Sequence, residues 1–308
     1  MRKALFAATA AGMLATPAHA AEPQTFKPSG QWVADFGEDY CRLSRPFSDG
    51  TNTVTIALER IQPVNSVRLI MVGNGIRMYR GSTELEYTLA PSGGSRKGPF
   101  WKSVTADGQD YLNLGEAAIA QPMAFGPRPG AGAAPPQPGE PRPIPPYDRA
   151  AEQEFAAGIN AIEITSGLIE PVRFETGGLK APIGVLQSCA DDLLKVWGLD
   201  PAKHQTMTRP AQPSGDASKW LPTGTIGFGD FGKLGGSANQ VRVLVSAEGK
   251  PTTCAVHWAS LEQKANDTIC KSIMDKGQFF PAMDAQNQPM ASYWTVAPFF
   301  LMPPMGGR

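Results

Sequence analysis

Histidine and cysteine are the side chains most suited to chemistry, and the chain has few of either. The three histidines are His19, His204 and His257. Cys254, His257 and the later Cys270 have the residue types that bind zinc. Residues three apart on a strand point to opposite faces, however, and no fourth ligand lies nearby in the sequence. We therefore expect a disulfide and a solvent-facing His257, and we predict no metal site and no cofactor.

The four cysteines are expected to pair, because thiols in an oxidising compartment normally form disulfides. They are Cys41, Cys189, Cys254 and Cys270, and four thiols allow three connectivities. Position along the chain favours Cys41–Cys189 and Cys254–Cys270, with one bridge in each half. The second bridge closes a short loop, which the chain-entropy model values at roughly 3 kcal/mol.

No pattern in the sequence assembles a nucleophile, a base and a group that orients the base. There is no Gly-x-Ser-x-Gly elbow, phosphate-binding loop or dinucleotide fingerprint. The run 73–75, Gly-Asn-Gly, is not followed by a helix and is better interpreted as a turn. Asp191 and Asp192 are adjacent on a predicted helix, so their side chains diverge by about 100° and make a poor acid–base pair. We predict that the protein is not an enzyme.

The overall composition favours short strands and argues against a nucleic-acid partner. The chain has 28 Lys and Arg against 28 Asp and Glu, so no net field attracts nucleic acid or an anionic membrane. It has 33 glycines and 29 prolines, about a fifth of all residues against an average near 12%. Such a composition indicates many turns between short elements.

The first twenty residues predict a signal peptide. Arg2 and Lys3 give a positive start, residues 4–15 form an uncharged apolar run, and Ala18-His19-Ala20 supplies small residues for a peptidase. The apolar run is shorter than the roughly 20 residues of a membrane span. We expect cleavage after Ala20 and a periplasmic product. If the N-terminus is retained, it would instead anchor the protein to a membrane.

Residues 21–199 predict a β-rich N-terminal domain. The runs 53–58 and 84–89 alternate, and so does 66–72 in its first half. Glycine-rich or proline-containing turns separate these runs, which predicts an antiparallel meander over 31–114. A further strand is expected around Ile162 and Ile164.

This domain is also expected to contain two helices and a long loop. Asp148 can cap a helix that ends before Gly158, and Pro182 can open a helix that ends at Gly198. Residues 121–146 contain ten prolines, which predicts an extended, solvated loop. Residues 200–223, rich in Pro, Ser, Gly and Thr, predict a linker.

Residues 224–302 predict a β-β-α-β domain, so that the fold class is α+β, and a short tail follows at 303–308. The expected elements are a strand at 241–245, a turn at 247–250, a strand at 252–258, a helix ending at Gly277 and a last strand at 290–301. Ser260 and Gln263, three residues apart, have the capping-box pattern of a helix start.

The residues of this domain resemble the C-terminal domain of TonB-type energy transducers. The resemblance is carried by Val243-x-Val245-x2-Glu248-Gly249-Lys250, Cys254, Cys270 and Phe280-Pro281-Ala282. It is strongest to the variety in which a strand cysteine and a helix cysteine are paired, and it spans about a quarter of the chain. Trp258-Ala259-Ser260 departs from the Ser-Ser-Gly of many relatives, and the Tyr-Pro pair that often precedes the first strand is missing.

The resemblance implies that the protein recognises a partner by strand addition. An edge strand offers unpaired N–H and C=O groups that an extended segment of another protein completes. This partner-binding edge strand would be Ser292, Tyr293, Trp294, Thr295, Val296 and Ala297. Pro298 lacks an N–H group and fits only an edge or a strand end. The alternative is that Pro303-Pro304 or the other domain covers this edge.

We therefore predict a non-catalytic periplasmic protein that binds an envelope protein in TonB-linked outer-membrane transport. The periplasmic segment of an outer-membrane receptor is the kind of partner that the resemblance implies. Two alternatives stay open. One is a membrane-anchored TonB-type energy transducer with an uncleaved N-terminus; the other is an envelope ligand-binding protein or enzyme built on the N-terminal domain, which would need a cavity with convergent polar groups.

Overall fold

The computed structural model describes residues 22–120, 140–141, 144, 147–235 and 238–302. The predicted signal peptide, almost all of the predicted proline-rich loop and the tail 303–308 lie outside these ranges. Within them the chain is α+β, as predicted, with many strands and a few helices. None of the helices in these ranges is long and apolar enough to cross a bilayer.

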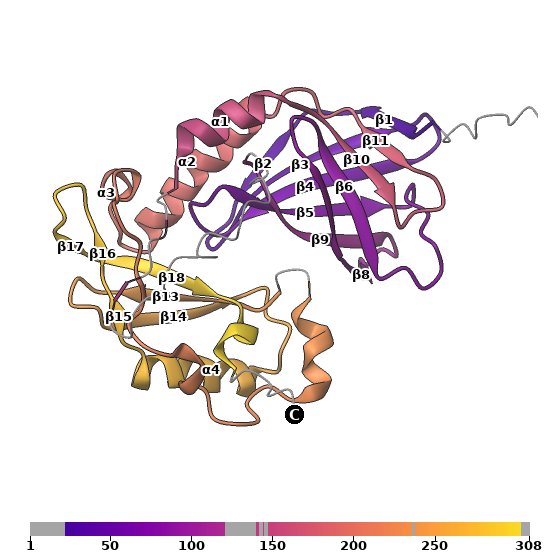
Figure 1. The fold of residues 1–308 in the computed structure, drawn as a ribbon. Coiled ribbons are helices and arrows are strands. Elements are labelled where there is room, and N and C mark those ends of the chain that lie inside the picture. The colour runs from indigo at the N-terminus through magenta and orange to yellow at the C-terminus, as the bar shows by residue number, and fades with distance from the viewer. Residues whose placement is uncertain (1–21, 121–139, 142–143, 145–146, 236–237, 303–308) are drawn as a thin grey trace, which may run out of the picture.

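The N-terminal part, residues 22–199, is built around a sheet of 11 strands. These are β1 (Gln24–Pro28), β2 (Val33–Phe36), β3 (Cys41–Ser48), β4 (Thr53–Arg60), β5 (Ser66–Gly73), β6 (Glu84–Pro91), β7 (Ser95–Pro99), β8 (Trp101–Val104), β9 (Asp110–Ala118), β10 (Ile159–Ser166) and β11 (Val172–Phe174). Their order is β7-β6-β10-β11-β1-β3-β4-β5-β9-β8, with β2 beside β3. Only Phe100 separates β7 from β8, so one bent strand joins both ends of this order. The sheet therefore closes on itself like a barrel (Figure 1).

The predicted meander is correct for β3, β4 and β5 and wrong beyond them. β6 pairs with β10 instead of β5, and β9 takes the place beside β5. β1 and β11 pair in parallel. Apolar alternation fixes which side chains face the core, but it does not identify the neighbouring strand. The connection through 74–83 carries β6 to the opposite side of the barrel.

Side chains fill the interior of this barrel. Phe26, Phe47 and Phe174 are fully buried, with ring centroids 4.9 Å apart for Phe26 and Phe174 and 5.8 Å apart for Phe47 and Phe174. The surrounding core is aliphatic and includes Ile56, Leu58, Leu69, Met71, Leu85, Leu89, Leu112 and Ile162. The large residues leave the barrel with a packed core rather than a ligand chamber.

Two helices lie along one side of the barrel and reach towards the C-terminal part (Figure 1). In α1 (Arg149–Ala157) the Asp148 carboxylate accepts from the N–H of Ala151 at 2.9 Å, which confirms the predicted cap. α2 (Lys180–Val196) buries an apolar face that includes Ile183, Leu186, Ala190 and Leu193. The disulfide between Cys41 and Cys189, with Cα atoms 5.8 Å apart, ties α2 to β3 as predicted.

The C-terminal part contains a three-stranded antiparallel sheet in the order β14-β13-β18. Its strands are β13 (Gln240–Val245), β14 (Pro251–His257) and β18 (Ser292–Val296), and α4 (Gln263–Lys276) lies between β14 and β18 in the sequence. The predicted disulfide Cys254–Cys270 joins β14 to α4. Smaller elements are α3 (Pro201–Gln205), β12 (Gln212–Pro213), β15 (Phe279–Phe280), β16 (Ala282–Met283), β17 (Pro289–Met290) and the 3-10 turns η1 (Ala217–Lys219), η2 (Phe228–Leu234) and η3 (Pro298–Leu301).

Each part has its own hydrophobic cluster. The first contains buried residues from Phe26 to Leu199, and the second contains buried residues from Ala211 to Leu301. Residues 200–223, expected to be a linker, carry α3, β12 and η1, and Trp220 and Leu221 belong to the second cluster. Residues 200–223 are therefore folded and packed against the C-terminal part, and do not form an open linker.

The predicted capping box at Ser260 is wrong. α4 begins at Gln263, its N-cap is Glu262, and no side chain caps it. The side chain of Asn239 explains why Ser260 is not a cap. Its buried Oδ1 accepts from the N–H groups of Ser260 and Leu261, both at 3.1 Å, and so holds these residues in the turn before the helix.

Candidate functional site

The sheet of the C-terminal part is covered on both faces. Val243 and Trp294 face α4 and the second hydrophobic cluster. The opposite side, which we call the docked face, carries Arg242, Leu244, His257, Tyr293 and Thr295. These side chains share a face because residues paired across neighbouring strands point the same way. The docked face lies against the N-terminal part.

Arg242 makes the central contact of the docked face. Its Nη1 lies 3.0 Å from Oδ1 of Asp39, in the turn between β2 and β3. Its guanidinium lies 4.1 Å from the ring centroid of Trp197, just beyond α2. Burial lowers the pKa of Arg242, while the hydrogen bond and charge of Asp39 oppose this shift. Arg242 therefore binds two separate elements of the N-terminal part.

The second edge of β18 is open in the described part of the chain. β18 pairs with β13, and no backbone hydrogen bond to another described segment involves Ser292–Val296. Thr252 of β14 donates to the carbonyl oxygen of Leu244 at 3.2 Å, so the main-chain groups of Leu244 point towards β14. Those of Val243 and Val245 then point towards β18.

This alternation identifies the residues whose main chain faces the open edge. Trp294 and Ser292 are the partners of Val243 and Val245, so their N–H and C=O groups point back to β13. The main-chain groups of the alternate residues, Tyr293 and Thr295, point outwards. The predicted edge strand thus divides into inward and outward positions. It ends at Val296, since Pro298 begins η3.

The side chains of Tyr293 and Thr295 are held by the loop between β4 and β5. The Tyr293 hydroxyl donates to the carbonyl oxygen of Pro63 at 3.1 Å, and Thr295 donates to Oε1 of Gln62 at 2.5 Å. Burial raises the pKa of Tyr293. The N-terminal part therefore covers the face of β18, and its described residues leave the outer edge open.

Trp294 and Val296 point to the other face of β18. The Trp294 ring lies 5.8 Å from that of Trp220 and 5.3 Å from that of Phe279. This aromatic cluster anchors β18 in the second core. Both faces of β18 are thus occupied, by different parts of the chain.

His204 of α3 holds the start of β18. Its Nδ1 donates to the carbonyl oxygen of Asp200 at 2.8 Å, so its Nε2 accepts the bond from Ser292 Oγ at 3.1 Å. Its ring stacks on Tyr293 with centroids 6.0 Å apart. Ser292, His204 and a carbonyl stand in the order of a nucleophile, base and orienting group. Ser292 is only 1% exposed, however, so no substrate carbonyl reaches its Oγ, and the contact positions α3 on β18.

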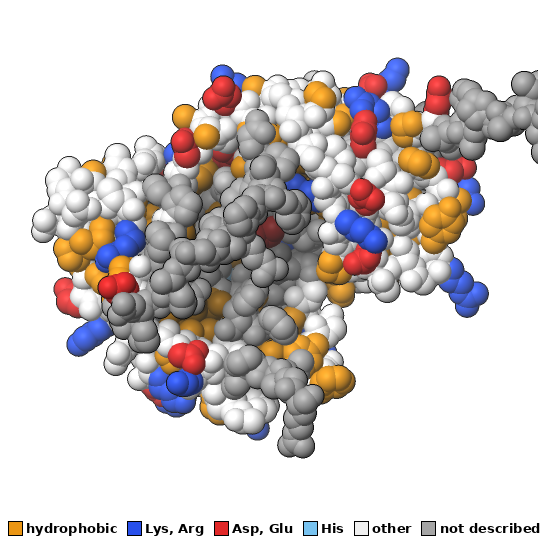
Figure 2. Space-filling view, viewed as in Figure 1, with side chains coloured by type: hydrophobic (Ala, Val, Ile, Leu, Met, Phe, Trp, Pro, Cys, Tyr) orange, Lys and Arg blue, Asp and Glu red, His pale blue; other side chains and the backbone are white. Residues whose placement is uncertain are grey.

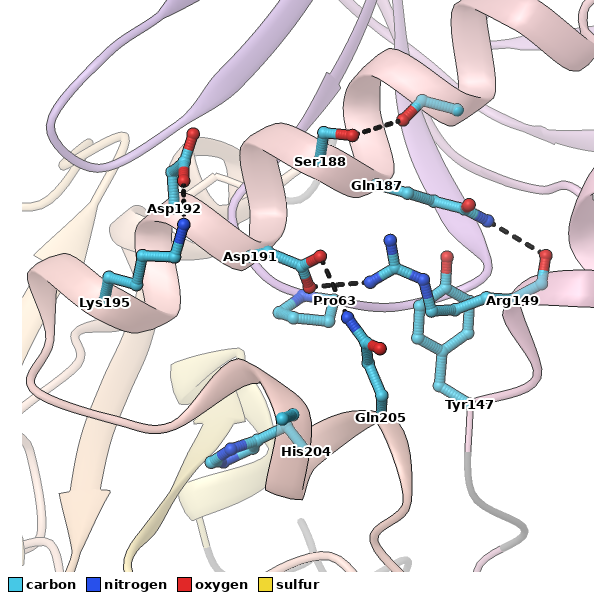
Figure 3. Close-up of polar contacts among 12 residues, drawn as sticks. Pro63, Tyr147, Arg149, Gln187, Ser188, Asp191, Asp192, Lys195, His204 and Gln205 are labelled. Atoms are coloured by element: carbon cyan, nitrogen blue, oxygen red, sulfur yellow. Dashed lines mark hydrogen bonds and ion pairs between the residues drawn. The ribbon is translucent and has the colours of Figure 1, made fainter.

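A polar network joins α1, α2 and α3 beside this strand (Figure 3). Arg149 lies 2.6 Å from Asp191, which also accepts from Gln205 at 3.1 Å. Asp192 points away from this group and pairs with Lys195. The predicted divergence of the two aspartates is therefore confirmed, since they have separate partners.

Tyr147, Arg60 and Glu152 form a buried group behind this network. Nη2 of Arg60 lies 2.6 Å from Oε1 of Glu152, and both side chains are almost fully buried. Tyr147 donates to the same carboxylate. Burial raises the pKa of Tyr147 to about 12, with the Arg60 charge acting in the opposite direction. The group is therefore a buried ion pair with one additional hydrogen bond from Tyr147.

His257 is buried, contrary to the prediction that it faces solvent. It is 5% exposed, and its Nε2 has no hydrogen-bond partner among the described residues. Burial lowers the pKa of His257 to about 4, with further lowering by the Arg242 charge. The predicted strand was correct, but the N-terminal part covers the face to which His257 belongs.

A row of alternating charges crosses β3, β4 and β5, and its last member contacts Trp258, the residue after His257. Arg42, Glu59 and Arg68 are successive cross-strand partners. Glu59 is fully buried; it pairs with Arg42 and lies 2.9 Å from Arg68. The Arg68 guanidinium lies 3.7 Å from the ring centroid of Trp258. Trp258 has a φ of +49°, a strained value for a bulky residue, and Asn239 fixes the turn that presents it.

A wide, shallow depression lies on the N-terminal part. It has a volume of about 460 Å³ and is lined by Arg45, Asn160, Arg173, Glu175 and Thr176, among others. Arg45 donates to two backbone carbonyls, and Arg173 pairs with Glu163. No described group of three or more histidine, cysteine or acidic residues is arranged to hold a metal ion. On the face in Figure 2, charges of both signs are interspersed, in keeping with the balanced composition.

Comparison with known proteins gives no relative. No family model, curated protein or solved structure matches the chain.

Proposed function

We propose that the protein is a non-catalytic binding module of the cell envelope that takes up an extended segment of a partner protein at the outer edge of β18. The observation that carries this proposal is the combination of two packed faces with one edge that no described segment covers. A strand held rigidly on both faces loses little conformational freedom when a partner strand pairs with it. Tyr293 and Thr295 supply the outward N–H and C=O groups.

The resemblance to TonB-type C-terminal domains supports the same proposal and suggests the partner. It is carried by the hairpin residues, the paired cysteines and Phe280-Pro281-Ala282 of the C-terminal part. The elements β13, β14, α4 and β18 follow one another in the order of that domain. A periplasmic segment of an outer-membrane receptor is the partner that this relation favours, and the two disulfides are typical of proteins that fold outside the cytoplasm.

The proposal is tested with Thr295→Pro, which removes one outward N–H donor. Edge strands tolerate proline, whereas Val296→Pro would remove an inward donor and break the ladder to β13. Thr295→Val is the matched control, because it loses the hydroxyl bond to Gln62 but keeps the backbone donor. Each variant is immobilised and exposed to solubilised cell envelope, and captured proteins are identified by mass spectrometry.

We expect the wild type and Thr295→Val to capture the same envelope protein and Thr295→Pro to lose it, with unchanged circular dichroism. Binding should also slow hydrogen exchange at the amides of Tyr293 and Thr295. Equal capture by Thr295→Pro, or unchanged exchange at these two amides in the complex, would rule out pairing at this edge.

A further inference from the structure

The two parts of the chain are built so that they can separate without either losing its core. Each has its own hydrophobic cluster and its own disulfide. The contacts between them on the docked face are mostly polar or aromatic: Arg242 with Asp39 and Trp197, Tyr293 with Pro63, and Thr295 with Gln62. Leu244 adds an aliphatic contact with the first cluster, but it is only partly buried there. Interfaces of this polar character within one chain commonly open and close.

His257 occupies a special position in this interface. It pairs across the sheet with Gln240 and so lies on the same face as Arg242, two residues further along β13. It is 5% exposed, and its buried Nε2 has no partner among the described residues. A neutral imidazole is accommodated there at the cost of one unmade hydrogen bond. A charged imidazolium would need a carboxylate of its own.

The charges around His257 do not provide one. Arg242 on β13 is a cation, and Asp39 in the turn between β2 and β3 already pairs with it at 3.0 Å. From β5, Arg68 approaches the neighbouring Trp258 together with its own partner, Glu59, at 2.9 Å. Protonation of His257 would therefore place another positive charge in a buried region whose carboxylates already have cationic partners.

We propose that His257 makes the docking of the C-terminal sheet on the N-terminal part dependent on pH, so that acid releases the docked face. The inference does not depend on the identity of the partner or on the function of β18. It gives the chain a conformational response to acidification of the compartment in which it folds.

The direction follows from the two states of His257. In the docked state its pKa is lowered to about 4 from the ordinary 6.5, whereas in the released state it is solvated. Above pH 6.5 both states hold a neutral imidazole, so docking is unaffected. As pH falls below 6.5 the released state binds the proton first, and docking weakens until pH reaches about 4. For one proton, the equilibrium constant for docking at pH 5 is about thirtyfold lower than at a pH where His257 is neutral in both states.

The test measures how often the docked face becomes accessible. Thr295, which contacts Gln62 across the interface, is replaced by cysteine in the otherwise wild-type full chain, and the rate at which a thiol reagent labels it at pH 7 and pH 5 is divided by that of an unfolded peptide carrying the same cysteine. When opening is fast relative to labelling, this ratio follows the open population. We expect it to rise about twentyfold from pH 7 to pH 5 in the chain that keeps His257, and less than about threefold in His257→Gln, which cannot take up the proton.

Two further variants keep the proposal open to refutation. If His257→Gln does not fold at pH 7, Arg242→Gln replaces it, because a protonated His257 could then pair with Asp39 and the rise should shrink. Burial also lowers the pKa of His204, so His204→Gln must retain most of the rise. The proposal is overturned if the wild type shows no rise, if His257→Gln rises as much as the wild type, or if His204→Gln alone abolishes it.

Discussion

The ion pair between Arg60 and Glu152 is almost completely removed from solvent, and Tyr147 and Gln187 complete the hydrogen bonds of its carboxylate. Burying two charges is costly, and their attraction offsets this cost only while both are present. The pair fixes α1 against the end of β4, next to the loop that holds β18. Its integrity therefore matters both for stability and for the position of the edge.

We predict that Glu152→Gln lowers the free energy of unfolding by about 3–5 kcal/mol, because Arg60 would remain buried and unpaired. Urea unfolding followed by circular dichroism measures the change. Asp192→Asn is the control: its partner Lys195 is exposed, and exposed pairs contribute about 0–1 kcal/mol. An equal decrease in the free energy of unfolding in the two variants would show that the buried ion pair contributes no more to stability than the exposed one.

Individual residues could be predicted from the sequence where local chemistry decides their role. The Asp148 cap and the divergence of Asp191 and Asp192 depend on neighbours within one helix. His257 and Ser260 could not be predicted in this way. The first is buried by a surface more than a hundred residues earlier in the chain, and the second is held by the side chain of Asn239.

At the scale of elements, the two disulfides perform different tasks. Cys41–Cys189 spans 148 residues and joins α2 to the barrel, whereas Cys254–Cys270 spans 16 residues and joins α4 to β14. The short bridge lies within the C-terminal part, so its removal should lower the stability of that part. Both pairings could be predicted because each bridge lies within one half of the chain.

We predict that the double variant Cys254→Ser/Cys270→Ser loses roughly 3 kcal/mol of stability in the C-terminal part, as expected for a loop of this length. Native-state hydrogen exchange should show faster exchange of the amides of α4, with those of β10 unchanged as an internal control. Uniform acceleration in both elements would mean that the bridge supports the whole molecule. Unchanged exchange in α4 would mean that packing alone holds the helix.

Strand positions were also accessible to prediction, but strand neighbours were not. The runs that became β6 and the first half of β4 alternate clearly, since every second side chain there meets the core. The pairing of β6 with β10, across the proline-rich segment, leaves no trace in that alternation. The open edge of β18 is likewise a property of the sheet order β14-β13-β18.

At the scale of the whole molecule, the arrangement of the two parts decides what β18 can do. The docked face could not be predicted, because Arg242, Tyr293 and Thr295 have the composition of an ordinary solvated strand face. Their partners, Asp39 and Gln62, are more than 200 residues away. The N-terminal part covers one face of β18, and the edge beside it is open among the described residues; Pro303-Pro304, the other cover that the sequence suggested for this edge, lie outside them.

The contact between Arg68 and Trp258 tests whether this arrangement is energetically coupled. A buried cation over an indole ring contributes about 0.5–2 kcal/mol, and here the ring is held in a strained conformation to reach it. A double-mutant cycle of Arg68→Ala and Trp258→Ala, measured by urea unfolding, should give a coupling energy in that range. A parallel cycle of Arg68→Ala with Phe228→Ala, an exposed ring in η2, should be additive within about 0.5 kcal/mol. Additivity in both cycles would mean that Trp258 contacts the N-terminal part without stabilising it. Coupling in the Arg68–Trp258 cycle alone would establish that the two parts stabilise each other through the docked interface.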